Sequence, residues 1–384
     1  MTIVVIGDYI LDQYIHGRVE RISPESPNPI FREMWYEHRD GGSGNVVANL
    51  RTFNVRVDHY FDMMNHAVKK RYVCDNHLMF RSDSEQYVIN ENIDFDLTGI
   101  KYCILSDYRK GYLHYTRRII TRCKSFGCKV IVDPKKRLEN YIEADIVKLN
   151  QKELDDYTDG ESPVDLIHKY RLEALVVTRG KDGVSVYTKD TTSHIEGDKH
   201  SVSDVTGAGD VFIASMTYYL SVGNDLVTAC TKANKLAGLS VTKFGTYTLT
   251  QDDIRQVKTI FTNGCFDILH RGHIELLRQS KKLGGKLVVG LNSDQSVRRL
   301  KGNGRPVNKQ EDRKALLESL EWVDEVVIFD DDTPRRVIEN LRPDIITKGG
   351  DYTTDTVVGN DLAEVVIIPL VDNLSTTSII EKLR

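Results

Sequence analysis

One short segment combines glycines with two carboxylates in an order that suits phosphoryl transfer. The string Asp204-Val-Thr-Gly-Ala-Gly-Asp210 comes just before an apolar run. Small residues at the start of a helix leave its amide groups accessible, and the helix dipole attracts an anion to them. A carboxylate at Asp210 would repel a bound phosphate, yet it can take the proton from a hydroxyl that attacks the phosphate. The string therefore predicts a kinase site with Asp210 as its base; the alternative is an ordinary turn with a capping aspartate. The residues expected around the phosphate are Thr206, Gly207, Ala208 and Gly209.

A second segment places two histidines shortly after a glycine turn. It runs from Thr262-Asn-Gly-Cys-Phe-Asp267 to His270-Arg-Gly-His273. Histidines three residues apart lie on one face of a helix. They have neither cysteine partners nor an HExxH frame, so zinc binding is not expected. Their more natural task is to donate hydrogen bonds to phosphate oxygens as an α-phosphorus becomes five-coordinate, with two core or surface histidines as the alternative.

Both segments fall within a chain that alternates apolar runs with helical patterns. Such alternation predicts parallel sheets covered by helices, in two α/β units. The break is expected within residues 246–258, where a threonine-rich turn leads into a short charged stretch, and we assign residues 1–255 and 256–384 to the two units. The expected strands are residues 3–7, 103–106, 129–132, 146–149 and 174–178, then 260–263, 286–291 and 325–329, with helices over 113–126 and 163–170.

The stretch from residue 28 to residue 90 departs from that pattern. It is rich in aromatic and β-branched residues, which predict antiparallel strands at 31–36, 71–74 and 86–90. We expect these strands to leave the main sheet and return, as a lid or a dimer surface; a plain edge extension is the alternative. Exposed edge strands tend to pair unless they are covered, so we expect a homo-oligomer, a dimer through this lid.

The overall composition is that of an ordinary soluble protein. The 384 residues are 40% hydrophobic and 28% charged, and 52 Lys and Arg against 56 Asp and Glu give a net charge of -4. Such a balance argues against nucleic acid or an anionic membrane as a partner. No apolar run approaches the roughly 20 residues of a membrane span, and the first residues lack the basic region of a signal peptide. The six cysteines are scattered without zinc spacing, which is typical of reduced thiols in a cytoplasmic protein.

The string that ends at Asp210 resembles the signature of the ribokinase-like (PfkB) sugar kinases. That resemblance implies a ribokinase-like fold, with a parallel sheet and a small antiparallel lid. Asn150 and Glu153 match the family's NxxE motif, associated with Mg2+ and phosphate, and Glu153 would hold the metal through water. The sugar-binding residues that the resemblance implies are Asp12, Gly41, Gly42 and Asn45. Those implied for the nucleotide and its phosphates include Thr178, Gly180, Gly183 and Asn234.

The pair His270 and His273 is similar to the HxGH motif of the Rossmann-like nucleotidyltransferases, which include cytidylyl- and adenylyltransferases. Residues 374–380 match that superfamily's second motif, whose hydroxyls and helix N-terminus would bind phosphates. The motif's usual terminal arginine is absent, and Lys382 is out of register with it. The residues that the resemblance implies for the nucleotide and its phosphates are Thr262, Asn263, Gly264, Phe266, Asp267, Lys301, Lys348, Ser375, Thr376, Thr377 and Ser378.

The order of the two units resembles the bifunctional enzymes of ADP-heptose synthesis, which provide a lipopolysaccharide precursor. The resemblance is closest in residues 301–308, 331–334 and 348–352. It implies a cytoplasmic enzyme that uses ATP to phosphorylate heptose 7-phosphate at the anomeric hydroxyl, with Asp210 as base. It also implies adenylylation of heptose 1-phosphate to ADP-heptose, with release of pyrophosphate. Both steps would need Mg2+.

The sequence also departs from that family. Between Val55 and Lys70 the chain is shorter than the family pattern by about a helix and a strand, and the linker between the units is shorter as well. One alternative therefore keeps the adenylyltransferase active and makes the trimmed kinase unit structural. A second alternative takes another sugar or polyol phosphate as the substrate. A sensor that binds nucleotide and sugar without turnover is a third, but it would need neither Asp210 nor the histidines.

Overall fold

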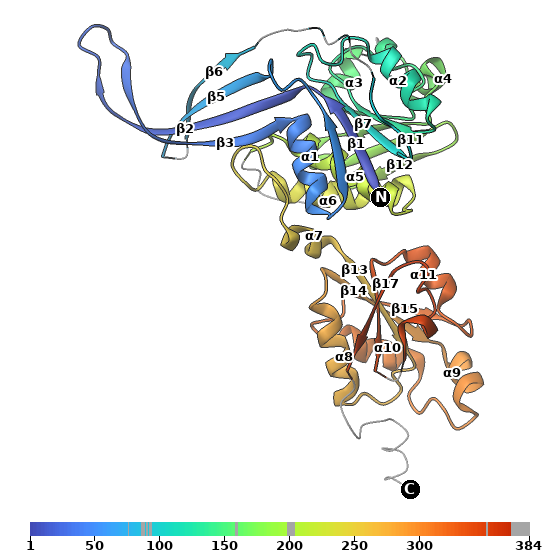
Figure 1. Cartoon of the computed structure of the whole chain (residues 1–384). Coiled ribbons are helices and arrows are strands. Elements are labelled where there is room, and N and C mark those ends of the chain that lie inside the picture. Colours follow the sequence, from blue (N-terminus) through green and yellow to red (C-terminus); the bar gives the residue numbers. More distant parts are fainter. Residues whose placement is uncertain are drawn as a thin grey trace. The chain divides into compact units, whose positions relative to one another are not determined.

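The structure is a computed structural model, and it describes residues 1–75, 77–85, 89, 91, 94–157, 160–197, 204–350 and 352–369. The chain divides into two compact units, Met1–Gln251 and Asp252–Arg384 (Figure 1). Each unit is built around its own sheet with helices packed on it, so the α/β class expected from the sequence is confirmed.

The first unit is centred on an eight-stranded sheet in the order β12-β11-β10-β9-β8-β7-β1-β4. The strands from β10 to β4 run parallel, and β11 and β12 continue the sheet in antiparallel fashion. The expected strands of this unit lie within β1 and β7 to β10, because strands covered on both faces read as continuous apolar runs. The bounds are β1 Thr2–Gly7, β4 Arg56–Tyr60, β7 Tyr102–Ser106, β8 Lys129–Asp133, β9 Ile146–Asn150, β10 Ala174–Thr178, β11 Val184–Thr188 and β12 Thr192–Ile195.

Helices cover both faces of this sheet (Figure 1). Helix α4 begins after Ser162, which accepts a hydrogen bond from a first-turn amide, and ends before Arg171, whose φ is 55°. Helix α2 begins at Thr116, later than the expected residue 113, because the Thr116 hydroxyl donates to the Leu113 carbonyl in a local turn. The bounds are α1 Ser43–Thr52, α2 Thr116–Ser125, η1 Leu138–Tyr141, α3 Gln151–Tyr157, α4 Pro163–Tyr170, η2 Gly180–Asp182, α5 Ala208–Ser221 and α6 Leu226–Ser240.

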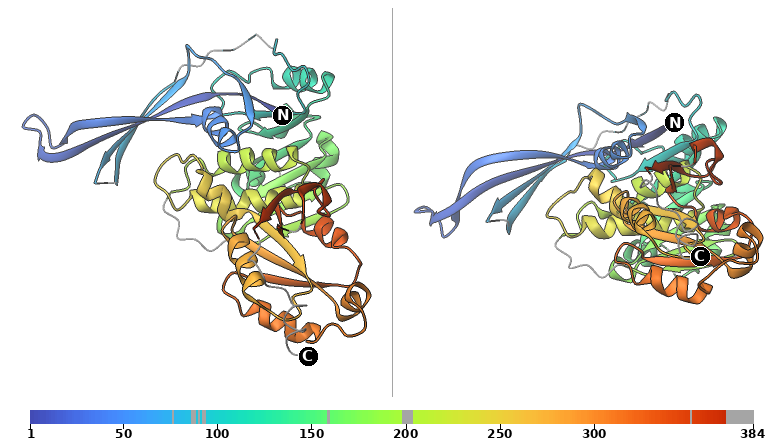
Figure 2. Two further views of the ribbon diagram at one scale, coloured as in Figure 1. Left: turned by 60° about the horizontal axis from the view of Figure 1, so that its bottom comes forward. Right: turned by 90° about the horizontal axis from the view of Figure 1, so that it is seen from below.

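A second sheet of the first unit, called the lid below, has the order β3-β2-β5-β6. Its strands are β2 Tyr9–Ile22, β3 Pro29–Gly42, β5 Ala67–Cys74 and β6 His77–Ser84. Strands β2 and β5 run parallel, and the other pairs are antiparallel. The hairpin of β2 and β3 extends away from the main sheet in both views of Figure 2.

The lid differs in its limits from the expected stretch of residues 28–90. It begins at Tyr9, only one residue after β1, because β2 carries its own alternation of buried and half-buried side chains. Within residues 28–90, α1 follows the lid strand β3, and β4 pairs with β1 in the main sheet. The expected strand at residues 86–90 lies largely outside the described residues.

The second unit contains a five-stranded parallel sheet in the order β15-β14-β13-β16-β17. Chain order reverses beside β13, and ligands of such sheets bind at the carboxyl ends of the strands at this point. The segment with the two histidines follows β13 directly and is therefore placed there. The bounds are α7 Gln251–Val257, β13 Thr259–Gly264, α8 Arg271–Lys281, β14 Lys286–Asn292, α9 Asp294–Lys301, α10 Gln310–Glu318, β15 Glu325–Phe329, α11 Arg335–Leu341, β16 Ile345–Gly349, η3 Thr354–Thr356 and β17 Glu364–Ile368.

Candidate active sites

Asp210 occupies the third position of helix α5, where three parts of the first unit meet. Its side chain is buried, and both carboxylate oxygens accept hydrogen bonds. Oδ1 accepts from the Tyr108 hydroxyl at 2.6 Å, and Oδ2 accepts from the Asn45 side-chain amide at 3.0 Å. The structure thus brings the expected base together with one residue of the expected sugar loop, Asn45. It adds Tyr108, which the sequence analysis did not single out.

The surroundings of Asp210 decide its protonation. Burial raises the pKa of this carboxyl to about 6, and the nearby Asp133 carboxylate adds to the rise. The hydrogen bonds from Tyr108 and Asn45 lower this pKa, as does the positive charge of Lys148. Burial also raises the pKa of the Tyr108 hydroxyl, so this group keeps its proton and stays a donor. A base whose pKa lies near the working pH is efficient, because it is ionised and can still hold a proton.

Close contacts around the base require the two glycines that precede it. Gly207 caps α5 in the left-handed region with a φ of 79°, and a Cβ there would lie 2.8 Å from the Asn45 amide nitrogen. A Cβ on Gly209 would lie 2.8 Å from the Nζ of Lys148. With Ala208 between them, these residues leave the start of α5 uncovered by large side chains. The helix start is therefore suited to an anion.

The turn before these glycines is closed by Asp204. Its Oδ1 accepts hydrogen bonds from the Thr206 amide at 2.9 Å and from the Thr206 hydroxyl at 2.7 Å. Its Oδ2 accepts from the Gly245 amide at 2.9 Å. The Thr206 hydroxyl therefore stabilises this turn, and Asp204 links the turn to the loop at residues 245–246.

Tyr108 is held by a carboxylate from another strand end. Asp8, which follows β1, accepts hydrogen bonds from the amides of Tyr108 at 2.8 Å, Lys110 at 3.1 Å and Tyr112 at 3.0 Å. The side chain of Asp8 is buried. These three contacts fix the loop after β7, so the hydroxyl that donates to Asp210 has a defined position.

Asp12 lies on the lid strand β2 and is already engaged in the structure. Its Oδ1 forms a buried ion pair with Arg71, and its Oδ2 accepts a hydrogen bond from the Thr246 hydroxyl at 2.7 Å. Gly41 lies against it, since a Cβ at Gly41 would be 2.6 Å from Oδ2 of Asp12. Gly42 has a φ of 56° and leads directly into α1. The expected sugar residues therefore lie together, with Arg71 and Thr246 as additional partners.

Asn150 and Glu153 hold each other at the start of α3. The Glu153 amide donates to Asn150 Oδ1 at 2.8 Å, and the Asn150 amide donates to Glu153 Oε2 at 2.9 Å, which is the reciprocal pattern of a capping box. The Oε1 of Glu153 is paired with Lys135. Among the described residues, no group of three or more His, Cys, Asp or Glu is placed to hold a metal ion.

The residues expected at the nucleotide fall into two groups. A Cβ on Gly183 would overlap the backbone of residues 195–197, and Asn234 donates to a carbonyl of the same segment at 3.1 Å. Gly183 and Asn234 therefore lie close to each other at the end of β12. Thr178 ends β10, and Gly180, with a φ of 58°, begins η2.

His270 and His273 lie at the start of α8 in the second unit, with 3.9 Å between their ring centroids. The Nδ1 of His270 accepts a hydrogen bond from the Gly272 amide at 3.1 Å, so a neutral ring carries its proton on Nε2. Burial lowers the pKa of both histidines, and His270 helps to lower that of His273 to about 4. At neutral pH, the two rings are therefore uncharged and can donate hydrogen bonds to a phosphate.

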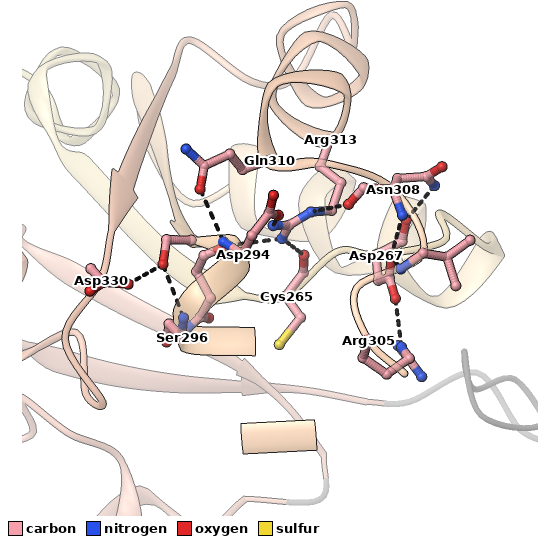
Figure 3. A network of polar contacts seen from close by, with 12 residues as sticks. Cys265, Asp267, Asp294, Ser296, Arg305, Asn308, Gln310, Arg313 and Asp330 are labelled. Carbon is pink, nitrogen blue, oxygen red and sulfur yellow. Dashed lines mark hydrogen bonds and ion pairs between the residues drawn. The ribbon is translucent and has the colours of Figure 1, made fainter. Parts of the chain in front are cut away.

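Arg313 on α10 is fully buried and joins the loops around this site (Figure 3). Its guanidinium donates to the carbonyls of Cys265 at 2.6 Å, Asn292 at 2.9 Å and Asn308 at 3.0 Å, and to Asp294 Oδ1 at 2.7 Å. The acceptors follow β13, end β14, precede α10 and begin α9. One side chain thus holds four segments together, and no local sequence pattern predicts this role.

Asp267 anchors the loop before α10 (Figure 3). Its Oδ1 accepts from the amides of Val307 at 2.8 Å and Asn308 at 3.0 Å, and its Oδ2 pairs with Arg305 at 2.5 Å. The motif resemblance predicts that Asp267 contacts the nucleotide. In the structure, both of its carboxylate oxygens instead hold this loop.

Two further expected residues lie at the end of β13. Thr262 is buried, and its hydroxyl donates to the Thr347 carbonyl at 3.0 Å. The backbone carbonyl of Asn263 accepts from Lys348 Nζ at 3.1 Å. The side-chain oxygen of Asn263 is buried without a hydrogen-bond partner among the described residues. Such an acceptor is suited to a donor on a ligand.

The other residues expected in the transferase site make fewer contacts, or lie outside the described part of the chain. The Phe266 ring lies 5.1 Å from that of His273, and a Cβ on Gly264 would be 3.2 Å from the Phe266 ring. Lys301 is exposed at the end of α9, and its charge opposes the rise that burial causes in the pKa of Cys265. The residues Ser375, Thr376, Thr377 and Ser378 lie outside the described part of the chain.

Two family models match the chain, one in each unit. Residues 96–253 match the pfkB family of carbohydrate kinases, and residues 261–382 match the cytidylyltransferase-like family. Asp210 lies within the first match, and both histidines lie within the second. Across the part of the chain that the structure describes, no helix is long and apolar enough to cross a membrane.

Relatives from several bacteria match both units at once. A bifunctional protein HldE from Mesorhizobium japonicum is 36% identical over 470 residues, which covers 100% of this chain and 95% of the relative. This chain belongs to the HldE family of bifunctional proteins. HldE proteins from Pseudomonas fluorescens and Azotobacter vinelandii are 33% and 34% identical over 459 residues, with 96% and 97% of their lengths covered. The family expected from the sequence is confirmed, and the chain is an enzyme that joins a carbohydrate kinase to a nucleotidyltransferase.

The HldE relatives carry segments that this chain lacks. The alignments extend over 459 to 470 residues, whereas the chain has 384. In the region that the sequence analysis found to be short, residues 61–66 alone connect β4 to β5.

Solved structures share the fold of sugar kinases with this chain. A ribokinase from Thermotoga maritima covers 67% of this chain and 98% of its own length, with a TM-score of 0.54 and 16% identity. Phosphofructokinase-2 from Escherichia coli covers 66% of this chain and 97% of its own length, with a TM-score of 0.56 and 16% identity. At such identities the likeness concerns the fold, and it confirms the ribokinase-like fold expected from the sequence.

We predict that the kinase activity falls as the pH drops below about 6, because Asp210 must be ionised to act as the base. The pH profile of kcat/KM reports groups of the free enzyme, so it should show an acidic limb with an apparent pKa of about 6. Adenylylation by the same protein should lack that limb, because the pKa of His273 is about 4. A kinase profile that stays flat across this limb would show that Asp210 is not the base.

We predict that Arg313→Met lowers the free energy of unfolding of the second unit by about 3 kcal/mol or more, because buried acceptors lose their donor. The chain has 2 tryptophans, Trp35 and Trp322. In a Trp35→Phe background, fluorescence during urea denaturation therefore follows the second unit. Arg335→Met is the matched control, since Arg335 is an exposed arginine paired with two carboxylates, and it should change stability by less than about 1 kcal/mol. Equal effects of the two variants would contradict the role of Arg313.

Proposed function

We propose that this enzyme carries out two steps of ADP-heptose synthesis. Residues 1–255 transfer the γ-phosphate of ATP to the anomeric hydroxyl of heptose 7-phosphate. Residues 256–384 join heptose 1-phosphate to the AMP part of ATP and release pyrophosphate. The observation that carries the proposal is the presence, in one chain of the HldE family, of a buried carboxylate at a glycine-rich helix start and of two neutral histidines after β13. Removal of the 7-phosphate between the steps belongs to another enzyme, and all these steps take place in the cytoplasm.

In the kinase step, Asp210 takes the proton of the anomeric hydroxyl as its oxygen attacks the γ-phosphorus. The bond from that phosphorus to ADP breaks, and ADP leaves. Tyr108 and Asn45 orient the base through the hydrogen bonds that they donate to it. The amides at the start of α5, at residues 207–209, bind the negative charge that grows on the phosphoryl oxygens. The adenosine part of ATP lies against Thr178, Gly180, Gly183 and Asn234.

The lid supplies the sugar site, with Asp12, Gly41 and Gly42. Two cations there favour a sugar that carries its own phosphate. Arg71 pairs with Asp12, and Lys69 lies opposite Asp12 in the register of β2 and β5. Burial lowers the pKa of Lys69, and Arg71 lowers it further, although Asp12 opposes this. A half-buried lysine beside another cation is stabilised by an anion, such as the 7-phosphate.

Glu153 would hold a magnesium ion in the kinase site through water, since carboxylate oxygens are ligands that Mg2+ prefers. When bound with the phosphates of ATP, the ion would neutralise part of their charge. The transferase step would need Mg2+ for the same reason.

In the transferase step, a phosphate oxygen of heptose 1-phosphate attacks the α-phosphorus of ATP. The bond to the β-phosphate breaks, and pyrophosphate leaves. His270 and His273 donate hydrogen bonds to oxygens of the five-coordinate α-phosphorus. Lys301 and Lys348 bring positive charge to the phosphates, and Ser375, Thr376, Thr377 and Ser378 bind those of the leaving pyrophosphate.

The lid also joins two copies of the chain into a dimer. Large apolar side chains on its strands are about half exposed or more, at Met34 (59%), Trp35 (54%), Tyr36 (64%), Leu78 (51%) and Phe80 (51%). Exposed apolar groups on strands of an open sheet favour pairing with a second sheet. A second copy presents the same surface and can cover these side chains.

We predict that the two chemistries can be separated by single substitutions. Asp210→Asn keeps the shape of the side chain but removes the base, so phosphorylation of heptose 7-phosphate should fall about a hundredfold to ten-thousandfold. Adenylylation of supplied heptose 1-phosphate should stay near the wild-type rate. His273→Ala removes a donor at the α-phosphorus and should slow adenylylation by about a hundredfold to a thousandfold, while the kinase step survives. Release of ADP and of pyrophosphate measures the two steps.

A mixture of the two variants, with the 7-phosphate removed by an added phosphatase, should restore the whole sequence, because the intermediates can diffuse between chains. If Asp210→Asn left heptose phosphorylation unchanged, the base assignment would be wrong. If one folded single variant lost both activities, the assignment of two separate sites would fail.

We predict that Met34→Glu combined with Tyr36→Glu converts the dimer into a monomer, because charges on the lid oppose burial against a second copy. Sedimentation velocity at micromolar concentration measures the change. Met63→Glu is the control, since Met63 is 74% exposed but lies on the loop before β5 rather than on a lid strand. A wild-type protein that is monomeric at this concentration would refute the dimer.

A further inference from the structure

A lysine stands within one of the central strands of the first unit. Lys148 is the third residue of β9, between the apolar Val147 and Leu149, and it is only 4% exposed. A buried ammonium group is unfavourable unless it is paired. The motifs found in the sequence give this residue no role.

The partner of Lys148 is a carboxylate at the end of the neighbouring strand. Its Nζ lies 3.2 Å from Oδ1 of Asp133, the last residue of β8, which is itself 2% exposed. An ammonium group has three N–H donors, and one hydrogen bond to Asp133 leaves capacity for a further acceptor. The pair lies where the strands approach the catalytic edge of the sheet.

The same ammonium group touches the start of α5. The position that a Cβ would take on Gly209 is 2.8 Å from Nζ of Lys148 and 3.8 Å from Oδ2 of Asp133. Gly209 directly precedes the base, and the charge of Lys148 acts on Asp210 strongly enough to lower its pKa. Any side chain at residue 209 would push the lysine away. The glycine thus keeps a cation in contact with the anion-binding turn.

We infer that Lys148 binds an oxygen of the γ-phosphoryl group while that group moves from ATP to the sugar. This inference rests on the kinase function proposed above. The lysine stays protonated throughout. The phosphorus bond to ADP breaks, the bond to the sugar oxygen forms, and the sugar proton goes to Asp210. Charge spreads over the phosphoryl oxygens in this transition state, so a cation there stabilises it beyond what the helix amides provide.

A purely structural role explains the pair less well. Apolar side chains of similar size in place of a buried ion pair are often neutral or stabilising for the fold. A pair that served packing alone would not need to touch Gly209 or to act on Asp210. Its position beside the base fits a cation that exchanges part of its interaction with Asp133 for the incoming phosphate.

Lys148→Met tests the inference, together with the double variant Asp133→Asn/Lys148→Met, which removes both charges and leaves no unpaired carboxylate. Both variants should lower kcat for phosphorylation of heptose 7-phosphate about a hundredfold or more. Adenylylation of heptose 1-phosphate should be unchanged, which also shows that the chain is folded. Lys129→Met is the control, since Lys129 pairs with Glu173 at 2.7 Å and begins β8 at the opposite end of the same sheet. It should leave both activities unchanged.

The pH profile separates a role in charge from a role in packing. Asp210 faces Tyr108, Asn45, Asp133 and Lys148. In Lys148→Met the acidic limb of the kinase profile should move to higher pH, because the lysine no longer lowers the pKa of Asp210. In the double variant the limb should move back toward the wild-type position, because the Asp133 charge that raises this pKa is also gone.

A second measurement does not depend on the sugar. Aluminium fluoride with ADP and Mg2+ mimics the transferring phosphoryl group, and its addition should tighten ADP binding to the wild-type chain. In Lys148→Met, the increase in ADP affinity that aluminium fluoride causes should be smaller by about tenfold or more. The affinity for ADP alone should be unchanged. If the folded double variant kept wild-type kcat and the full gain, Lys148 would have no role at the phosphate. If wild type failed to phosphorylate heptose 7-phosphate but the gain depended on Lys148, the proposed substrate would fail and this inference would stand.

Discussion

A carboxylate that must be both buried and ionised is the constraint on which the first unit depends. Burial raises the pKa of Asp210 to about 6, whereas its proposed role as a base requires the ionised form. The donors that keep this group ionised at neutral pH come from the loop after β7 and from α1, so two distant segments must meet at α5. Because this pKa lies above the ordinary value of 3.8, the ionised carboxyl destabilises the fold above pH 6, and that cost disappears as the pH falls toward 4.

The second unit handles phosphate charge by different means. It presents uncharged histidine rings, whose low pKa values follow from burial. Its buried Arg313 donates hydrogen bonds to backbone carbonyls and to Asp294. Arg313 and Asp267 together hold the loops that border the histidines (Figure 3). The positions of these uncharged rings therefore depend on charged side chains whose partners lie in the neighbouring loops.

Much of this arrangement could be predicted from the sequence, and the exceptions have a common cause. Strands β1 and β7 to β10 were found because burial on both faces leaves long apolar runs. Asp210, Asn45 and the histidines could be predicted as site residues because their neighbours form specific strings, and the structure places Asp210 against Asn45 and the two histidine rings together. Tyr108 and Lys148 were missed because their contacts join strand ends that are far apart in the sequence, as in the hydrogen bond from Tyr108 to Asp210 across 102 residues. No local pattern marks such a contact.

The lid start was missed for a different reason. Asp8 alone separates β1 from β2, so the chain passes from the main sheet into the lid without a loop or a turn residue to mark the change. The same aspartate holds the amides of the segment that carries Tyr108. A single residue therefore links the strand that carries Asp12 to the loop whose tyrosine donates a hydrogen bond to Asp210. The start of the lid and the position of Tyr108 thus depend on the same residue.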